Sequence, residues 1–242
     1  MASEKDERGF NQSFKKTSAS VMRLQRRFDY MINQMDPRKF NNMDTNVLEI
    51  GCAEGEGIHY LVSKIGVRGL GIDLSQKFID SANASYQSST LTYEVANFNE
   101  QESFKDKMAY GKFDYVIGNG ILHHLYYNLD NSLINLHKLL KPEGKIIFIE
   151  PNIFNPYVAL IFNIPYLRKK TFLEPDEMAF SSGFIREKLK KANFSDIRTE
   201  IRDFLLPNVP DGLIQPVIKL GNVLEKTPIT LIAQSIFITA SK

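Results

Sequence analysis

The apolar residues of this chain follow three successive patterns. From about Ser18 to Met35 they recur at helical spacing, which predicts an amphipathic helix ahead of the main domain. Asp36 and Pro37 should end this helix, because the residue before a proline avoids the helical conformation. Residues 1–20 open without such a period, so we expect the chain to begin as a mobile tail. The polar face of the helix carries Arg23, Arg26 and Arg27.

Between residues 46 and 150, short apolar runs alternate with amphipathic stretches. This order is typical of a parallel sheet covered by helices, and the nearly continuous apolar runs indicate strands buried on both faces. Strands are expected at 46–50, 69–73, 91–96, 115–118 and 145–150. Helices are expected at 57–65, 76–86, 102–109 and 129–140, with a turn at 141–144.

The pattern after residue 150 is less regular. Residues 152–170 are apolar and interrupted by prolines, and a helix at 181–191 begins with a serine, a residue that favours helix starts. A strand at 196–204, a helix at 213–224 and a final strand at 230–240 follow. The elements together predict an α/β domain with helices on both faces of its sheet.

The loop after the first strand carries the first chemical information. The strand ends beside Glu49, an acid that can meet a cationic ligand group, and runs into a turn containing Gly51 and Gly55. Asp73 lies 22 residues beyond Gly51, close to the spacing of about 20 at which a carboxylate binds ribose hydroxyls. This order predicts a ribose-bearing ligand. The alternative is that the glycines only shape a turn and that Asp73 caps the next helix.

The stretches VLEIGCAEG, GIDLS, YEVANFNE and FDYVIGNGILHHL resemble the motifs of class I S-adenosylmethionine-dependent methyltransferases, in the type 11, small-molecule branch. The ending SIFITASK resembles the last strand of that family. The resemblance implies a Rossmann-like, seven-stranded, mostly parallel sheet with an antiparallel last strand, and S-adenosyl-L-methionine as the cofactor. A nicotinamide-dependent dehydrogenase is the main rival interpretation.

The resemblance also implies which residues hold that cofactor. Two of them depart from the family pattern: Ala53 replaces the middle glycine of the first motif, and Asn97 replaces the aspartate expected near the adenine amino group. An amide oxygen can still accept from that amine, although the contact loses its charge. The implied cofactor residues are Glu49, Gly51, Cys52, Ala53, Gly55, Asp73, Leu74, Asn97, Phe98 and Asn119.

The fourth motif is where methyl transfer would occur. The resemblance places Gly118 and Asn119 near the methionine part of the cofactor, with Gly120 leaving room for the reacting group. His123 and His124 follow, and either could act as a general base for a hydroxyl or an acidic carbon, because imidazole titrates near neutral pH. The alternative is structural: His124 packs under the loop while His123 faces the helix surface.

Several absences narrow the chemistry. An Asn/Asp-Pro-Pro-aromatic loop, expected for enzymes that methylate exocyclic amines of nucleic acids, does not follow the fourth strand. The single cysteine, Cys52, lies in the cofactor loop and is expected to pack there rather than act as a nucleophile. The sequence shows no acidic or Cys/His cluster spaced for metal binding, so no metal is predicted.

The apolar segment at 153–170 allows three interpretations. It can be a helix buried against the sheet or in a dimer interface. It can form a lid over a greasy or glycan-linked lipid acceptor, with the 213–224 helix as the opposite wall and the arginine-bearing helix closing over the cofactor. It can also dip into an anionic membrane surface, with Arg168, Lys169 and Lys170 at the headgroups.

Composition bounds the remaining possibilities. The 242 residues carry 30 basic and 28 acidic side chains, a balance that argues against a nucleic-acid partner. One cysteine and the lack of an apolar leader favour a cytoplasmic protein. Separately, we expect a monomer or a homodimer. We expect a tail and lid helix at 1–40 and a methyltransferase domain at 41–242, with insertions at about 153–180 and 205–229.

The predicted function is methylation of a small or lipid- or glycan-linked acceptor, at oxygen or carbon. The alternatives are a catalytically silent protein that binds S-adenosylmethionine, and a protein or nucleic-acid methyltransferase. Transient contact with a membrane surface remains among the expected partners.

Overall fold

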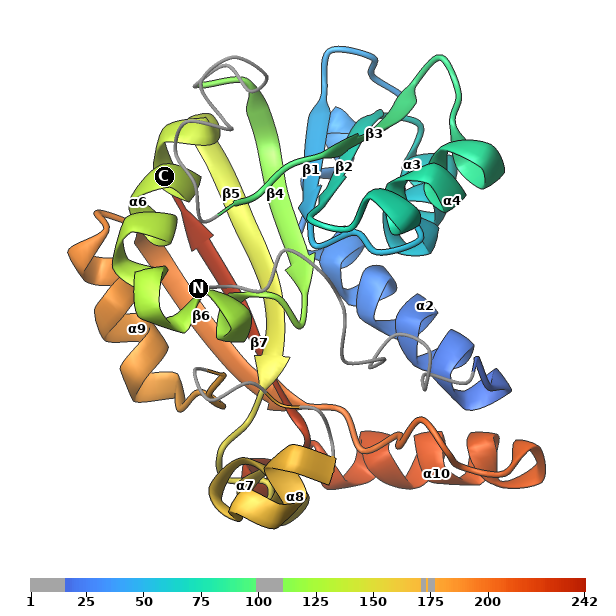
Figure 1. Ribbon diagram of the computed structural model, residues 1–242, viewed down its shortest axis with the longest axis vertical. Coiled ribbons are helices and arrows are strands. Elements are labelled where there is room, and N and C mark those ends of the chain that lie inside the picture. The colour runs from blue at the N-terminus through green and yellow to red at the C-terminus, as the bar shows by residue number, and fades with distance from the viewer. Residues whose placement is uncertain (1–15, 99–110, 171–172, 174–176) are drawn as a thin grey trace.

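The computed structural model describes residues 16–98, 111–170, 173 and 177–242. Seven strands form one sheet in the order β3-β2-β1-β4-β5-β7-β6 (Figure 1). Six neighbouring pairs place β7 antiparallel to β5 and β6 while the other strands run parallel, which confirms the predicted fold class. The strands are β1 Asn46–Ile50, β2 Arg68–Asp73, β3 Leu91–Val95, β4 Phe113–Asn119, β5 Leu140–Pro151, β6 Ser195–Arg202 and β7 Ser235–Ser241.

Helices cover both faces of the sheet (Figure 1). The α-helices are α2 Ser18–Asn33, α3 Glu56–Ile65, α4 Gln76–Tyr86, α6 Leu129–Leu139, α7 Pro156–Asn163, α8 Pro165–Lys170, α9 Ser182–Lys191 and α10 Asp211–Leu224. Three short 3₁₀ helices are η1 Pro37–Lys39, η2 Leu122–Asn128 and η3 Pro228–Ile232. In the described residues, no helix is both long enough and apolar enough to cross a membrane.

The sheet separates two apolar cores. On one face, α6 and α9 bury Leu133, Leu136 and Leu189 against strand residues such as Val116 and Phe148. On the other face, α2, α3 and α4 pack on the opposite sides of the same strands. Because central strands are buried on both faces, they lack the alternation of a half-exposed sheet, as the apolar runs had indicated.

Two expectations about element positions were wrong. Residues 141–144 are no separate turn but lie inside β5 as an irregularity, where Leu140 pairs with Phe113 and Lys145 with Tyr115. Glu143 supplies the left-handed backbone there, with φ +62°. The final strand starts at Ser235 rather than at 230, because Pro228 opens η3.

The N-terminal helix α2 begins at Ser18, where the apolar spacing predicted it. Thr17 caps α2: its hydroxyl accepts from the Ser20 N–H while the Ser20 hydroxyl accepts from the Thr17 N–H. This capping box satisfies two of the free donors at the helix start. The expected tail over 1–15 and the expected helix at 102–109 lie outside the described residues.

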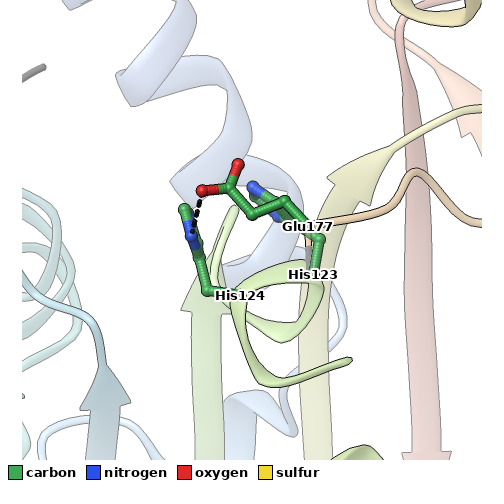
Figure 2. Close-up of side chains that lie close together, drawn as sticks. All are labelled: His123, His124 and Glu177. Atoms are coloured by element: carbon green, nitrogen blue, oxygen red, sulfur yellow. Dashed lines mark ion pairs between the residues drawn. The ribbon is translucent and has the colours of Figure 1, made fainter. Parts of the chain in front are cut away.

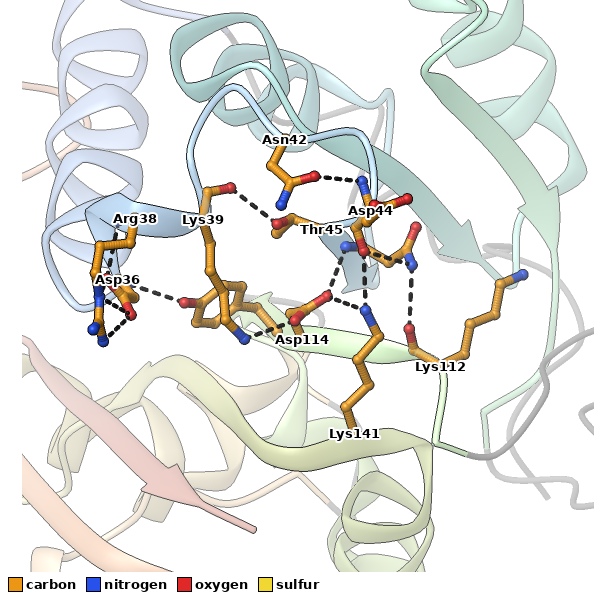
Figure 3. A network of polar contacts seen from close by, with 11 residues as sticks. Asp36, Arg38, Lys39, Asn42, Asp44, Thr45, Lys112, Asp114 and Lys141 are labelled. Carbon is orange, nitrogen blue, oxygen red and sulfur yellow. Dashed lines mark hydrogen bonds and ion pairs between the residues drawn. The ribbon is translucent and has the colours of Figure 1, made fainter.

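The amino ends of the strands are joined by a polar network around Asp114 (Figure 3). The buried carboxylate accepts from the Asn46 backbone and from the ammonium groups of Lys39 and Lys141, each at 2.7–3.0 Å. Burial alone would raise the pKa of Asp114, but these bonds hold it below its ordinary value. The network therefore ties the segment after α2 to β1, β4 and β5 at the edge opposite the predicted site.

Candidate active site

The predicted cofactor residues gather at one edge of the sheet. They follow the carboxyl ends of β1, β2, β3 and β4, which are neighbours in the sheet. In open α/β sheets this edge, at the point where the strand order reverses, is where ligands bind. Here the reversal falls between β1 and β4.

The loop between β1 and α3 needs its glycines for backbone geometry. Gly51 and Gly55 have φ of +68° and +83°, in the left-handed region. A Cβ atom at Gly51 would lie 2.7 Å from Ile121 Cδ1, and one at Gly55 would lie 2.5 Å from Tyr93 Cε1. The side chains of Ile121 and Tyr93 therefore occupy the space that a side chain at Gly51 or Gly55 would need. Ala53 keeps the left-handed conformation of the glycine it replaces, with φ +46°.

Glu49 is buried under this loop and bonds to the helix that follows. Its Oε2 accepts the Ile58 N–H at 2.9 Å, in the first turn of α3. Burial raises the pKa of Glu49 to about 8, although the Ile58 bond works against the rise. The side chain is therefore largely protonated at neutral pH.

Asp73 joins the ends of β1 and β2. Its Oδ2 accepts the Ala53 N–H at 3.0 Å, and its Oδ1 accepts the Ser75 N–H at 2.9 Å. Burial raises the pKa of Asp73, while these backbone bonds oppose the rise. Since a carboxylate offers about four acceptor positions, Asp73 keeps capacity for hydroxyl donors such as those of a ribose. The Asp73 carboxylate thus fits the predicted cofactor, and the helix cap of α4 comes from Ser75 instead.

The other predicted cofactor residues lie around these two acids. Cys52 is buried with its sulfur packed beside Gly71, and burial raises the pKa of its thiol, so it is a poor nucleophile. Leu74 is partly exposed directly after Asp73. Asn97 and the buried Phe98 follow β3, one strand further out.

Beyond β4, the chain turns into η2 and places His123 against a buried acid. His123 Nδ1 lies 2.7 Å from Glu150 Oε2, at the carboxyl end of the neighbouring strand β5. Glu150 also accepts the backbone N–H groups of Ile121, Leu122 and His123. A carboxyl group surrounded by donors acts as an acceptor, so we assign the proton to His123 Nδ1, which leaves Nε2 free to accept.

Burial lowers the pKa of His123, the nearby His124 lowers it further, and Glu150 opposes both. His123 is therefore neutral at neutral pH. A Cβ atom at Gly120 would lie 3.7 Å from His123 Cε1, an ordinary contact distance, so the turn at Gly120 lies directly beside this ring. The structural alternative had the two histidines reversed: His123 is the buried one, and His124 is exposed.

His124 contacts a second acid, from the segment after α8 (Figure 2). Its Nδ1 lies 3.1 Å from Oε1 of Glu177, a buried side chain. Within the described residues, His123, His124 and Glu177 form a group whose possible ligand atoms lie within 4.8 Å of one another, so they could hold a divalent ion. Sequence spacing did not reveal this group, and the expectation that no metal is bound stays a prediction.

Helix α2 reaches the same edge through Arg27. Its guanidinium donates to Asn119 Oδ1 at 2.7 Å, to Asp203 Oδ2 at 2.8 Å and to Ser235 Oγ at 2.6 Å. Burial lowers the pKa of Arg27 to about 10, so it remains charged at neutral pH. Asn119, predicted to lie near the methionine part of the cofactor, is thus oriented from the N-terminal helix.

A cavity of about 710 Å³ lies behind this contact, between α2, the end of β6 and α10. Ion pairs join several of the charged groups that line it: Arg23 and Arg27 pair with Asp203, and Arg202 pairs with Glu225. Arg27 lines this cavity and also bonds to Asn119, a predicted cofactor residue. The cavity therefore adjoins the site from the side of α2.

Sequence reasoning missed Glu150, Glu177 and the role of Arg27. Glu150 could have been found from the sequence, because it lies near the carboxyl end of a buried parallel strand, as Glu49 and Asp73 do. Glu177 had none, since it lies in an irregular segment. Arg27 was recognised only as one of three arginines on a polar helix face.

Comparison with known proteins agrees with this geometry. Residues 48–146 match the family model described as a methyltransferase domain. The fold is similar to a SAM-dependent methyltransferase from Archaeoglobus fulgidus, with a TM-score of 0.65 and 17% identity over 98% of this chain and 100% of that one. It is also similar to the CurJ carbon methyltransferase, with a TM-score of 0.63 and 18% identity over 98% of this chain and 58% of that one.

Among curated proteins, the chain is 25% identical over 184 residues to highly reducing polyketide synthase 40 of Fusarium mangiferae. The match covers 73% of this chain and 7% of the synthase, so the chain spans a small part of that relative's length. The fold is Rossmann-like, and the predicted cofactor residues gather at the carboxyl edge of its sheet, where ligands bind in open α/β sheets. Residues 48–146 match a methyltransferase domain, and the fold is one that SAM-dependent methyltransferases share, in agreement with the cofactor that the motifs had indicated.

Proposed function

We propose that this chain methylates an acidic carbon or a hydroxyl of a small or lipid-linked acceptor, with His123 as the general base. The observation that carries the proposal is the pair of His123 and Glu150 in the segment directly after β4. When bound, S-adenosylmethionine supplies an electrophilic methyl group and leaves as a neutral thioether. The protein must then position the acceptor, exclude water and remove one proton.

The pair suits proton removal for three reasons. His123 is neutral at working pH, so its Nε2 can accept the acceptor's proton. Glu150 fixes the ring orientation through Nδ1 and stabilises the imidazolium that forms. Burial keeps water from competing for the base. The acceptor's new bond forms with the methyl carbon as the methyl–sulfur bond breaks, and the proton stays on His123.

Cofactor contacts are assigned to the loop from Gly51 to Gly55, to Asp73 and Leu74 for the ribose, to Asn97 and Phe98 for the adenine, and to Asn119 for the methionine part. Glu49 lies beneath the loop, where it can meet a cationic group directly or through water. These assignments follow the family resemblance residue by residue, and the common edge of the sheet supports them.

Carbon is the atom we favour. One structural relative is named a carbon methyltransferase, and curated relatives are polyketide synthases. A carbon between two carbonyl groups, as in a β-ketoacyl thioester, is acidic enough for an imidazole base to deprotonate. An amine acceptor would need no such base, so the buried pair argues against it.

The test offers the protein methyl-labelled S-adenosylmethionine with a panel of β-ketoacyl thioesters, hydroxylated lipids and amines, and follows label transfer by mass spectrometry. We expect transfer to a thioester or hydroxyl, reduced about 10²- to 10⁴-fold in His123→Ala. His137→Ala is the matched control, because that ring lies in the last turn of α6 against Phe194. Asp73→Ala should weaken cofactor binding measured by calorimetry.

The outcomes separate the alternatives. No cofactor binding at millimolar concentration would contradict the proposal as a whole. Cofactor binding without transfer to any member of the panel would favour a catalytically silent protein. Transfer that His123→Ala leaves intact would remove the histidine from the mechanism.

A further inference from the structure

The exposed apolar side chains of this molecule are concentrated at one end. Among the described residues, twelve of the fifteen large hydrophobic side chains that are exposed come from the loops and helices around α7, α8, α10 and η3. Figure 1 shows these elements together beyond the carboxyl edge of the sheet. We call them the apolar end face: Phe154, Tyr157, Leu160, Ile164, Tyr166, Leu206, Leu213, Leu220, Val223, Ile229, Leu231 and Ile232.

Hydrogen bonds join the segments that carry this face. The Asn155 side chain, which caps α7, donates to the Ile232 carbonyl of η3 at 2.7 Å. Asn152 donates to the Leu231 carbonyl at 3.0 Å. Thr227 then links η3 back to α10 by donating from its backbone to the Leu224 carbonyl at 3.0 Å. Segments from two distant parts of the sequence therefore form one surface.

Helix α10 is apolar on two sides. Its inner side buries Ile214 and Ile218 in a small core with Ala19 and Leu205. Its outer side carries Leu213, Leu220 and Val223, which are 54–60% exposed. A surface helix ordinarily has a polar outer face, so an apolar one indicates that something apolar covers it.

Helix α7 repeats this arrangement. Val158 and Phe162 are buried, whereas Tyr157 and Leu160 are 58% and 52% exposed. The Phe162 ring lies 6.4 Å from the His123 ring, so the inner side of α7 adjoins the candidate active site. The outer sides of both helices point away from the protein core.

Charge decides between the possible occupants. The segments 153–170 and 211–232 carry five basic residues and two acidic ones. Lys169, Lys170, Lys219 and Lys226 are exposed, while one of the two acids, Glu225, is paired with Arg202. Two copies joined through this face would bring these cations together, whereas an anionic surface would attract them.

We propose that the apolar end face docks on the surface of an anionic lipid bilayer, with its exposed leucines and aromatic rings at the acyl boundary and its lysines at the headgroups. This is the arrangement of interfacial helices, which lie in the membrane plane. Neither α7 nor α10 spans the bilayer, consistent with the lack of a spanning helix in the described part of the chain. The proposal does not depend on the reaction at His123.

The test is flotation of the full chain with vesicles of equal parts phosphatidylcholine and phosphatidylglycerol, and with vesicles of phosphatidylcholine alone. We expect binding to the anionic vesicles, weakened by high salt because the lysine contacts are screened. Leu220→Ser should weaken binding about tenfold, since one buried leucine side chain is lost from the apolar contact. Ile134→Ser, an exposed apolar position on α6, is the matched control and should change nothing.

The charge arm uses the double variant Lys169→Glu with Lys170→Glu, for which we expect at least about tenfold weaker binding to anionic vesicles. Lys77→Glu, on an exposed position of α4, is its control. Circular dichroism verifies that each variant is folded. Absence of binding to anionic vesicles would overturn the proposal. A dimer that sedimentation detects and that Leu220→Ser dissociates, without any vesicle binding, would also overturn the proposal. A second copy of the chain would then be what covers this face.

Discussion

At the scale of single residues, three acids at the carboxyl ends of strands have different tasks. Glu49 is buried with one backbone donor and has a raised pKa. Asp73 connects two loops through backbone donors, and Glu150 accepts from three backbone groups and a histidine. The number and kind of donors around each carboxyl group therefore differ, and we propose that they suit Glu49 to hold a proton, Asp73 to bind hydroxyls and Glu150 to orient a base.

The proton on Glu49 gives the first prediction. S-adenosylmethionine carries positive charge, and a cation close to Glu49 favours its ionised form. Binding near pH 7 should therefore release a fraction of a proton from a group whose pKa is about 8. Calorimetry in buffers of different ionisation enthalpy measures this release as a dependence of the apparent enthalpy on the buffer.

Glu49→Gln should abolish that buffer dependence, because the amide has no proton to lose. Glu54→Gln is the control, since Glu54 is an exposed neighbour in the same loop. A wild-type protein that shows no buffer dependence, or a Glu49→Gln variant that retains it, would place the cofactor's charge away from Glu49.

The second prediction concerns the pH profile of methyl transfer. The base must be neutral, so activity should rise with pH through the lowered pKa of His123 and then level off. Glu150→Gln removes a negative charge that raises this pKa, so the rising limb should move to lower pH while the plateau falls. Cofactor affinity should not change. A variant with an unchanged profile and plateau would assign Glu150 a purely structural task.

At the scale of elements, the position of α2 matters most. Its Phe28 ring is fully buried against Gly57 of α3, where a Cβ atom would lie 2.1 Å from Phe28 Cζ. The same helix carries Arg27, which bonds to Asn119 and Asp203 at the site edge. A shift of α2 would therefore disturb both a core contact and the orientation of a predicted cofactor residue.

The third prediction follows from this contact. Gly57→Ala should destabilise the protein by about 1–3 kcal/mol, because the added methyl group overpacks a filled space. Gly183→Ala, a helical position in α9 with open space around it, should instead stabilise by about 0.4–1 kcal/mol. Chemical denaturation measures both. If Phe28→Leu restores part of the loss in Gly57→Ala, the clash is located at that ring, and no recovery would locate it elsewhere.

At the scale of the whole molecule, the two edges of the sheet serve different purposes. The carboxyl edge gathers the predicted cofactor residues, the candidate base and the apolar end face. The amino edge is closed by the Asp114 network, in which three donors from separate segments meet one carboxylate (Figure 3). The network can hold the sheet together without limiting movement at the site.

The fourth prediction tests that network through pH. The folded pKa of Asp114 is lowered, so its contribution to stability is present above the unfolded value near 3.8 and is lost as pH falls through the folded pKa. Asp114→Asn should lower the free energy of unfolding at pH 7 by about 1–2 kcal/mol and remove this part of the acid sensitivity. Asp80→Asn, at an exposed position on α4, is the control.

Urea denaturation at pH 7 and at a series of lower pH values that extends below the folded pKa of Asp114 measures the difference. Equal stability of wild type and Asp114→Asn at pH 7 would mean that the two lysine contacts and the backbone contact add nothing to the fold. A loss that persists below the folded pKa of Asp114 would assign the effect to packing rather than to charge.

Sequence alone was sufficient for features set by neighbouring residues. The strand at 46–50, the helix at 76–86 and the serine cap at Ser181 depend on local apolar periodicity and capping chemistry, so they were predicted to the residue or nearly so. The cofactor motif was recognisable for the same reason, because its loop and its acid lie within one βαβ unit. Local patterns did not predict where two strands begin. Residues 141–144, expected as a turn, lie inside β5, and residues 230–234, expected in the last strand, precede β7.

Tertiary structure alone decided which side chains meet across the sheet edge. His123 and Glu150 are 27 residues apart, and Arg27 and Asn119 are 92 apart. No periodicity connects such positions, because their meeting depends on strand order and on the packing of α2. The same holds for the apolar end face, which joins segments on either side of β6. The chain's sequence thus determined the fold and the loop predicted to bind the cofactor, and long-range packing determined which residues form the candidate base, its acid and the exposed surface beside them.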